Sequence, residues 1–160
     1  MSQKTDNLLV QGLSYGFAGK TKAKKVTRAS FILDSSHLNV GNSVYHDEWF
    51  ADRAGGGQEI VKVGSEKFTR VYAGGTIPKK DLVKLGTNND EVMNFLKKQI
   101  VENGKSIRLY HDFTSCAGNW NYSYKVVYKN ISIPLTLGQE IISYKGKLVF
   151  EHIFVLCPID

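Results

Sequence analysis

The chain has 160 residues, of which 42% are hydrophobic and 22% charged, a composition typical of a globular domain with its own core. No apolar run approaches the roughly 20 residues of a membrane-spanning helix, and the start lacks the features of a signal peptide. These features predict one cytoplasmic domain over residues 1–160, a monomer or homodimer without membrane contact. Cys116 and Cys157 are expected to be free thiols, and we expect neither a metal nor an organic cofactor.

The net charge of +6 is concentrated near the N-terminus, where the first 30 residues hold six basic side chains against one acidic side chain. A basic segment over residues 20–28 includes Lys22, Lys24, Lys25 and Arg28. Such a cluster can attract phosphate groups. The alternative is a solvated loop between a helix and a strand. The four side chains are therefore a candidate anion-binding site, with nucleic acid as the weaker expectation.

The first half of the chain predicts one helix followed by strands. Residues 5–18 place four apolar side chains near one helical face: Leu8, Leu9, Leu13 and Phe17. Alternating apolar residues then predict strands at 28–33, 44–50, 57–63 and 66–72. The dipeptide Gly64-Ser65 is suited to a hairpin turn between the last two strands.

The second half predicts the same order of elements. Pro78 and the lysines after it indicate a linker, and residues 87–104 predict a helix with Asn88 or Asn89 as its cap. The stripe expected to pack on a sheet consists of Val92, Phe95, Leu96, Ile100 and Gln99. Strands are expected at 107–113, 119–128, 137–144 and 147–156, the last two joined around Lys145-Gly146.

The tetrapeptide GQEI occurs at residues 57–60 and again at 138–141. Each copy begins the penultimate predicted strand of its half, and each is followed by a glycine-containing turn and an aromatic-rich strand. This pattern predicts a diverged internal duplication, with halves at about 5–77 and 88–157. The expected fold is α+β: two helix-plus-meander repeats share one curved antiparallel sheet, and the helices pack on one face.

Three stretches resemble a bacterial domain family of unknown function: LLVQGLSYGFAGK, VYHDEWFADRAGGGQEIVKVGSEKFTRVYAGG and WNYSYKVVYKNISIPLTLGQEIISYKGKLVFEHIF. The most specific elements are Y-x-D-x-W-F and the repeated G-Q-E-[IV]. Members of that family occur alone or behind a helix-turn-helix in transcriptional regulators, so the resemblance implies a stand-alone or regulatory module. The chain departs from the family in having no room for a DNA-binding headpiece and no Tyr-Gly ending in its final strand. The resemblance implies no catalytic residues.

Strand parity predicts how the two GQEI glutamates are paired. A two-residue turn at Gly64-Ser65 places Glu59 opposite Arg70, and a three-residue loop at 145–147 places Glu140 opposite His152. A buried carboxylate needs a partner, so both pairs are expected on physical grounds alone. We expect Glu140 to raise the pKa of His152 above its ordinary value of about 6.5.

These pairs have two interpretations. They either fix the register of the sheet or line a shared pocket able to bind a polar ligand or do acid–base chemistry. The candidate pocket residues are Glu59, Arg70, Tyr72, Glu140, His152, Trp120, Tyr122 and Tyr124. The aromatic members at 120–124, with Val126 and Tyr128 on the same predicted face, can stack on bases or sugars or form one wall of the core.

Function follows from the sequence only in outline. The first hypothesis is a non-enzymatic module that binds a small polar ligand or a protein partner. The alternative is a small cofactor-independent enzyme, isomerase- or hydratase-like, that uses the Glu and His residues. A phosphate-binding loop at GFAGKT is excluded because Ser14 occupies the position of the first required glycine and the order of helix and strand is reversed.

Overall fold

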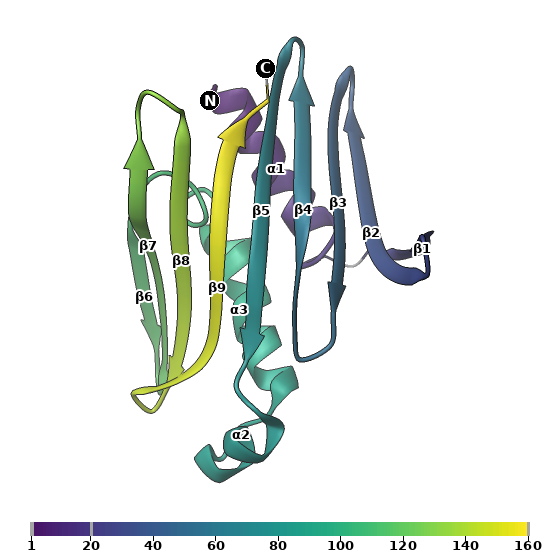
Figure 1. Cartoon of the computed structure of the whole chain (residues 1–160). Coiled ribbons are helices and arrows are strands. Elements are labelled where there is room, and N and C mark those ends of the chain that lie inside the picture. Colours follow the sequence, from purple (N-terminus) through teal and green to yellow (C-terminus); the bar gives the residue numbers. More distant parts are fainter. Residues whose placement is uncertain (1, 20, 160) are drawn as a thin grey trace.

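The computed structural model describes residues 2–19 and 21–159. In this part of the chain, nine antiparallel strands form a single sheet and three helices accompany it (Figure 1). The first half contains α1 (Gln3–Tyr15), β1 (Lys24–Arg28), β2 (Phe31–Val40), β3 (Ser43–Ala51), β4 (Ala54–Val63) and β5 (Glu66–Thr76). The second half contains α2 (Lys79–Leu85), α3 (Asn89–Asn103), β6 (Phe113–Ala117), β7 (Trp120–Asn130), β8 (Leu135–Tyr144) and β9 (Lys147–Pro158).

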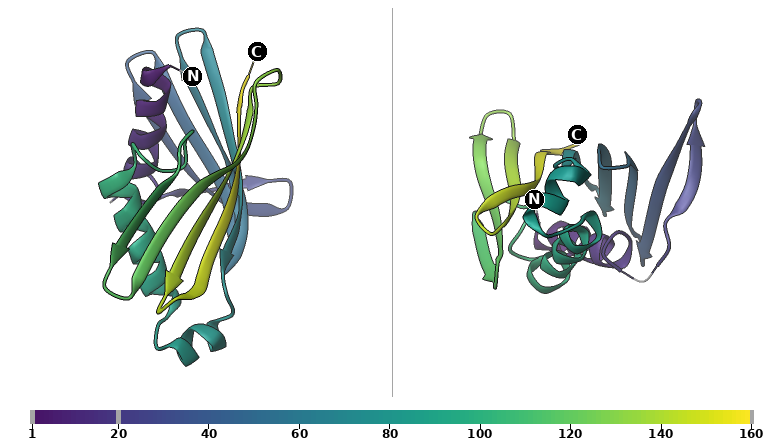
Figure 2. Two further views of the ribbon diagram at one scale, coloured as in Figure 1. Left: turned by 90° about the vertical axis from the view of Figure 1, so that its left-hand side faces the viewer. Right: turned by 90° about the horizontal axis from the view of Figure 1, so that it is seen from below.

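The order of strands in the sheet is β1-β2-β3-β4-β5-β9-β8-β7-β6. Each half is therefore a meander, and the two meanders join where β5 pairs with β9, with Tyr72 opposite Phe154. Figure 2 shows the sheet curving around α1 and α3, which both lie on its inner face. The α+β class and the helices on one face agree with the sequence prediction. No helix in the described residues is long and apolar enough to cross a membrane.

Both long helices begin at a side-chain cap and bury one face. Ser2 accepts a hydrogen bond from the backbone of Thr5 at the start of α1, and Asn88 does the same for Glu91 in α3. The predicted stripe of α3 is confirmed, since all five of its members are buried. In α1 the buried side chains include Leu8, Leu9 and Leu13. These side chains and the inner face of the sheet form one continuous core.

Three predicted elements are wrong. Residues 28–33 do not form one strand, because Ala29 has a φ of 52° and turns the chain into the β1–β2 hairpin. The stretch after Pro78 is the short helix α2, for which Pro78 supplies the cap position. Residues 107–113 are not a strand before Phe113; Arg108 there has a φ of 59°, in the left-handed region that a strand cannot contain.

The hairpin between β8 and β9 corrects the predicted loop but keeps the predicted pairing. Lys145 and Gly146 form a two-residue turn with φ values of 49° and 73°, so Tyr144 pairs with Lys147. A bulge between this turn and the rest of the ladder inserts one extra residue in β9. The bulge restores the register, and Glu140 lies opposite His152 as predicted.

Candidate functional site

The predicted Glu59–Arg70 pair is confirmed and lies in the core. The two residues pair across β4 and β5, and their exposed fractions are 0% and 1%. Arg70 donates two hydrogen bonds to the Glu59 carboxylate and a third, at 2.7 Å, to the backbone carbonyl of Arg108. Tyr45 donates to the same carboxylate at 2.8 Å. The charge of Glu59 is thus fully compensated, as a buried ion pair requires.

The second glutamate has a different main partner from the one predicted. Arg108 donates to both oxygens of Glu140, at 2.8 and 2.7 Å, and Tyr122 donates at 2.6 Å. Burial alone would raise the pKa of Glu140, but the charge and hydrogen bonds of Arg108 outweigh it and hold that pKa below its ordinary value. Glu140 is therefore an ionised carboxylate whose hydrogen bonds come from Arg108 and Tyr122, without any from His152.

The expected rise in the pKa of His152 is wrong. Its Nδ1 lies 3.8 Å from Glu140 Oε2, too far for a hydrogen bond, and it makes none with any described residue. Burial lowers the pKa of His152 to about 4, while the charge of Glu140 opposes this and that of Arg108 adds to it. Burial outweighs the attraction of Glu140, whose charge Arg108 already compensates, so the imidazole is neutral at pH 7.

A cavity of about 200 Å³ lies between the inner face of the sheet and the helices, next to this network. Its walls come from the end of α1, the start of α3, the β3–β4 connection and strands β3, β4, β5 and β9. The apolar lining includes Phe17, Trp49, Met93 and Phe150, and the polar lining includes Asp47, Tyr72, Arg108 and His152. A pocket with aromatic walls and a few converging polar groups is a usual form of small-ligand site.

Glycines on paired strands let the walls of this cavity approach one another closely. Gly55 of β4 pairs with Gly74 of β5, and both line the cavity. A Cβ atom at Gly74 would lie 2.0 Å from the carbonyl oxygen of Glu151 and 2.6 Å from Cδ2 of His152. Gly74 also has a φ of 149°, which other residues rarely adopt. Glycine in a strand interior often marks a close approach of this kind.

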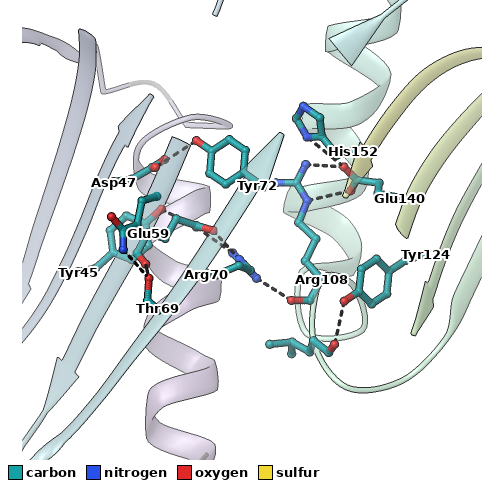
Figure 3. A network of polar contacts seen from close by, with 12 residues as sticks. Tyr45, Asp47, Glu59, Thr69, Arg70, Tyr72, Arg108, Tyr124, Glu140 and His152 are labelled. Atoms are coloured by element: carbon teal, nitrogen blue, oxygen red, sulfur yellow. Dashed lines mark hydrogen bonds and ion pairs between the residues drawn. The ribbon is translucent and has the colours of Figure 1, made fainter. Parts of the chain in front are cut away.

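Asp47 is the most perturbed acid at the cavity. It is 1% exposed, and Tyr72 donates a hydrogen bond of 3.1 Å to its Oδ1. Burial, reinforced by the negative charge of Glu59, raises the pKa of Asp47 to about 8, although the Tyr72 hydrogen bond opposes the shift. Figure 3 shows Tyr72 turned toward Asp47 on one side of the network, with His152, Arg108 and Glu140 on the other. The Asp47 carboxyl is consequently protonated at pH 7.

The structure separates the predicted pocket residues into three groups. Tyr72 and His152 line the cavity. Glu59, Arg70, Glu140 and Tyr122 form the buried network beside it, and Tyr124 donates to the carbonyl of Leu109 at 2.9 Å. Trp120 lies elsewhere, stacked on Phe95 of α3 at 5.1 Å and near Tyr144 at 4.5 Å.

The aromatic face of β7 is therefore mainly a wall of the core. Tyr122 and Tyr124 are 1% and 0% exposed, so neither can stack on a base or a sugar. The prediction that Tyr128 shares their face is wrong, because β7 shifts register between Val126 and Tyr128, leaving Tyr128 exposed.

Sequence reasoning missed Asp47, Trp49 and Arg108. The first two had a usable signal: alternation in YHDEWF places Tyr45, Asp47 and Trp49 on one face of β3, the face that meets Glu59. Arg108 had none, since its side chain reaches Glu140 from a left-handed position in an irregular segment.

The basic segment is partly neutralised. Lys24, Lys25 and Arg28 lie on the edge strand β1, and Lys22 is exposed just before it. Lys25 pairs with Asp34 at 2.8 Å, and Arg28 pairs with Glu48 at 2.6 Å. Lys20, at the start of the segment, lies outside the described residues. Among residues 2–19 and 21–159, no cluster of three or more His, Cys, Asp or Glu side chains could hold a metal ion.

We compared the chain with protein-family models, curated proteins and solved structures, and none of the three comparisons found a match. The resemblance to the bacterial family of unknown function stays a prediction.

Proposed function

We propose that this protein is a binding module that holds a small polar ligand in the cavity beside the Asp47–Tyr72 pair. The observation that carries the proposal is the cavity of about 200 Å³, in which aromatic walls meet buried polar groups. Glycines in its lining let neighbouring backbone approach closely, because a Cβ at Gly74 would collide with Glu151 and His152. A close-packed core leaves few spaces of this size, so the cavity supports a ligand site.

The test is a binding measurement with a cavity-blocking variant. Small single-ring compounds of different charge are titrated into the protein while backbone amide shifts are followed by NMR. We expect at least one compound to shift residues around Asp47 and His152, and Met93→Trp, which fills the cavity from α3, to abolish the shifts. Val101→Trp is the matched control, because Val101 lies on the same helix and is 60% exposed. Failure of every compound to bind would overturn the proposal.

A second candidate is a cofactor-independent proton-transfer enzyme. It is favoured by one observation: an acid with its pKa raised to about 8 and an imidazole with its pKa lowered to about 4 line the same cavity. His152 would accept a proton from carbon and Asp47 would give one to a carbonyl oxygen, which converts a ketone to its enol. The check is deuterium uptake from solvent at the α-carbon of cyclohexanone, which this candidate requires and the binding module does not.

We also propose that the two halves descend from an internal duplication. Gln58 donates to Thr69, which pairs with Ile60 on the next strand. Gln139 donates in the same way to Glu151, which pairs with Ile141. Each GQEI glutamate, Glu59 or Glu140, is buried and accepts from a tyrosine on the preceding strand and from an arginine. Each glycine lies under a tyrosine hydroxyl, and a Cβ there would collide with it. An ancestral three-stranded meander would account for the Gln contacts and the glutamate–tyrosine pairs, which come from equivalent strands. The arginines and the tyrosines over the glycines come from different places in the two halves: Arg70 and Tyr72 from β5, Arg108 from the segment before β6, and Tyr124 from β7.

Other roles have weaker support. The basic segment retains Lys22 and Lys24 as candidates for contacts with nucleic acid, but Lys25 and Arg28 already have acidic partners. A regulatory role in the bacterial cytoplasm, with a protein partner, rests on the family resemblance alone.

A further inference from the structure

The charges that line the cavity cancel one another. Arg108 forms a two-point ion pair with Glu140, and the β3–β4 connection contributes one acid, Asp52, and one base, Arg53. His152 is neutral at pH 7 because its pKa is about 4, and Asp47 is neutral because its pKa is about 8. A charged ligand would lose its hydration here and meet no uncompensated opposite charge, which is costly.

Two neutral groups of the lining can offer a ligand a donor and an acceptor, Asp47 and His152. The Tyr72 hydroxyl is used on Asp47 Oδ1, so the protonated Asp47 carboxyl has an O–H to offer. The Nδ1 of His152 is buried on the side of Glu140, and its Cδ2 lies over Gly74, a residue of the cavity lining. Because Nδ1 is buried against Glu140, Nε2 is the ring nitrogen left to accept a hydrogen bond from a ligand.

Size and wall chemistry restrict the ligand further. A dry cavity of about 150 Å³ admits benzene, so one of about 200 Å³ accepts one ring and a small substituent. Phe17 and Trp49 meet edge to face at 6.3 Å on one side, and the aromatic ring of Phe150 lines the cavity as well. Aromatic walls favour a flat ring, which can pack against their faces and edges.

We infer that the cavity selects an uncharged, flat, single-ring compound that carries a hydrogen-bond acceptor for the Asp47 carboxyl, as the carbonyl of an amide does. A donor elsewhere on the ligand can meet His152, which lines the same cavity. This inference rests on the proposed binding function and adds the chemical class of the ligand.

Benzoate, benzamide and benzamidine test the inference, because they share one shape and differ in charge. At about pH 6.5, between the pKa values of His152 and Asp47, they are an anion, a neutral molecule and a cation. We expect benzamide to bind at least about tenfold more tightly than either ion, as judged by dissociation constants from NMR titration. Tighter or equal binding of an ion that Met93→Trp abolishes would overturn the inference and leave the binding function standing. Absence of binding by all three would overturn both.

The pH dependence of benzamide binding identifies the donor. Raising the pH to about 9 ionises Asp47 and removes its O–H, so benzamide affinity should fall at least about fivefold. The charged and titratable groups that act on Asp47 are Glu59, Arg70, Tyr72 and Arg108. In Asp47→Asn, which cannot ionise, the fall should disappear. A fall of the same size in Asp47→Asn would assign the effect to another group and overturn the role of Asp47 as donor.

Discussion

Asp47 and His152 show how one environment acts oppositely on an acid and a base. Burial is the largest cause for both, and it disfavours whichever form is charged. The Asp47 carboxyl therefore stays protonated, and the His152 imidazole carries only one ring proton. Both groups are neutral. Around them, Glu59 and Glu140 remain compensated by arginines. The cavity is thus bordered by neutral groups, while the ionised groups are paired within the core.

Asp47→Asn should stabilise the protein at alkaline pH. The folded pKa of Asp47, about 8, lies above its ordinary value of 3.8, so its contribution is fully present below about pH 4 and is lost as pH rises through 8. Asparagine stays neutral and can still accept the Tyr72 hydrogen bond. Each pKa unit of this shift corresponds to about 1.4 kcal/mol, so we expect Asp47→Asn to gain at least that much relative to wild type at about pH 9. Urea unfolding across pH measures the difference, and a gain that does not grow with pH would contradict the raised pKa.

The ring of His152 should remain neutral down to about pH 4. Its folded pKa lies below its ordinary value of 6.5, so the unfolded chain takes up the proton first and stability falls as pH drops from about 6.5 to 4. NMR titration of the ring protons measures this directly. A His152 midpoint above about 6 would show that Glu140 attracts the proton despite Arg108. His152→Phe should remove this part of the pH dependence.

At the scale of elements, alternation predicted most of the sheet and its register. Glu59 opposite Arg70 and Glu140 opposite His152 both followed from parity and turn position. The predicted β8–β9 pairing was correct although the predicted loop was wrong. A one-residue slip would turn the apolar side chains of β9 to the outer face, whereas a bulge keeps them in the core. Alternation could not predict the left-handed backbone at Ala29 and Arg108, because neither alanine nor arginine favours that conformation. The cavity was missed because its lining comes from segments far apart in the sequence, from Leu13 to His152.

Gly74→Ala should destabilise β5 strongly. The added Cβ would lie 2.0 Å from the backbone oxygen of Glu151, and alanine is strained at a φ of 149°. We expect a loss of roughly 2–4 kcal/mol in unfolding free energy, from the strain and the collision together. Gly118→Ala is the matched control, because Gly118 has a φ of 59° but nothing within 4 Å of its Cβ position. It should cost only about 1 kcal/mol. Equal losses of unfolding free energy in the two variants would show that the backbone around Gly74 shifts to accommodate the added Cβ.

At the scale of the whole molecule, the two halves are joined by more than the sheet. The β5–β9 ladder runs from the pairing of Phe68 with Pro158 to that of Thr76 with Phe150. Arg70 of the first half also donates to the backbone of Arg108 in the second. Buried contacts of this kind cannot be kept by one half alone, so neither half has a complete core without the other.

The two halves should therefore unfold in one transition. Each contains one of the two tryptophans, Trp49 on β3 and Trp120 on β7. In the single-tryptophan variants Trp120→Phe and Trp49→Phe, fluorescence follows one half at a time during urea unfolding. Within each variant, we expect the fluorescence midpoint to coincide with that of far-ultraviolet circular dichroism. A fluorescence midpoint displaced from the circular dichroism midpoint would show that one half unfolds independently.

The position of β9 has a consequence for synthesis. This strand is translated after all the others, yet it lies between β5 and β8 in the middle of the sheet (Figure 1). Until it leaves the ribosome, the emerging chain has two separate meanders, each with an unpaired inner edge. Such edges invite pairing with other chains, and contacts between distant residues form slowly. The two meanders of a nascent chain are most exposed to aggregation before β9 is inserted between them, when chaperones would be of greatest use.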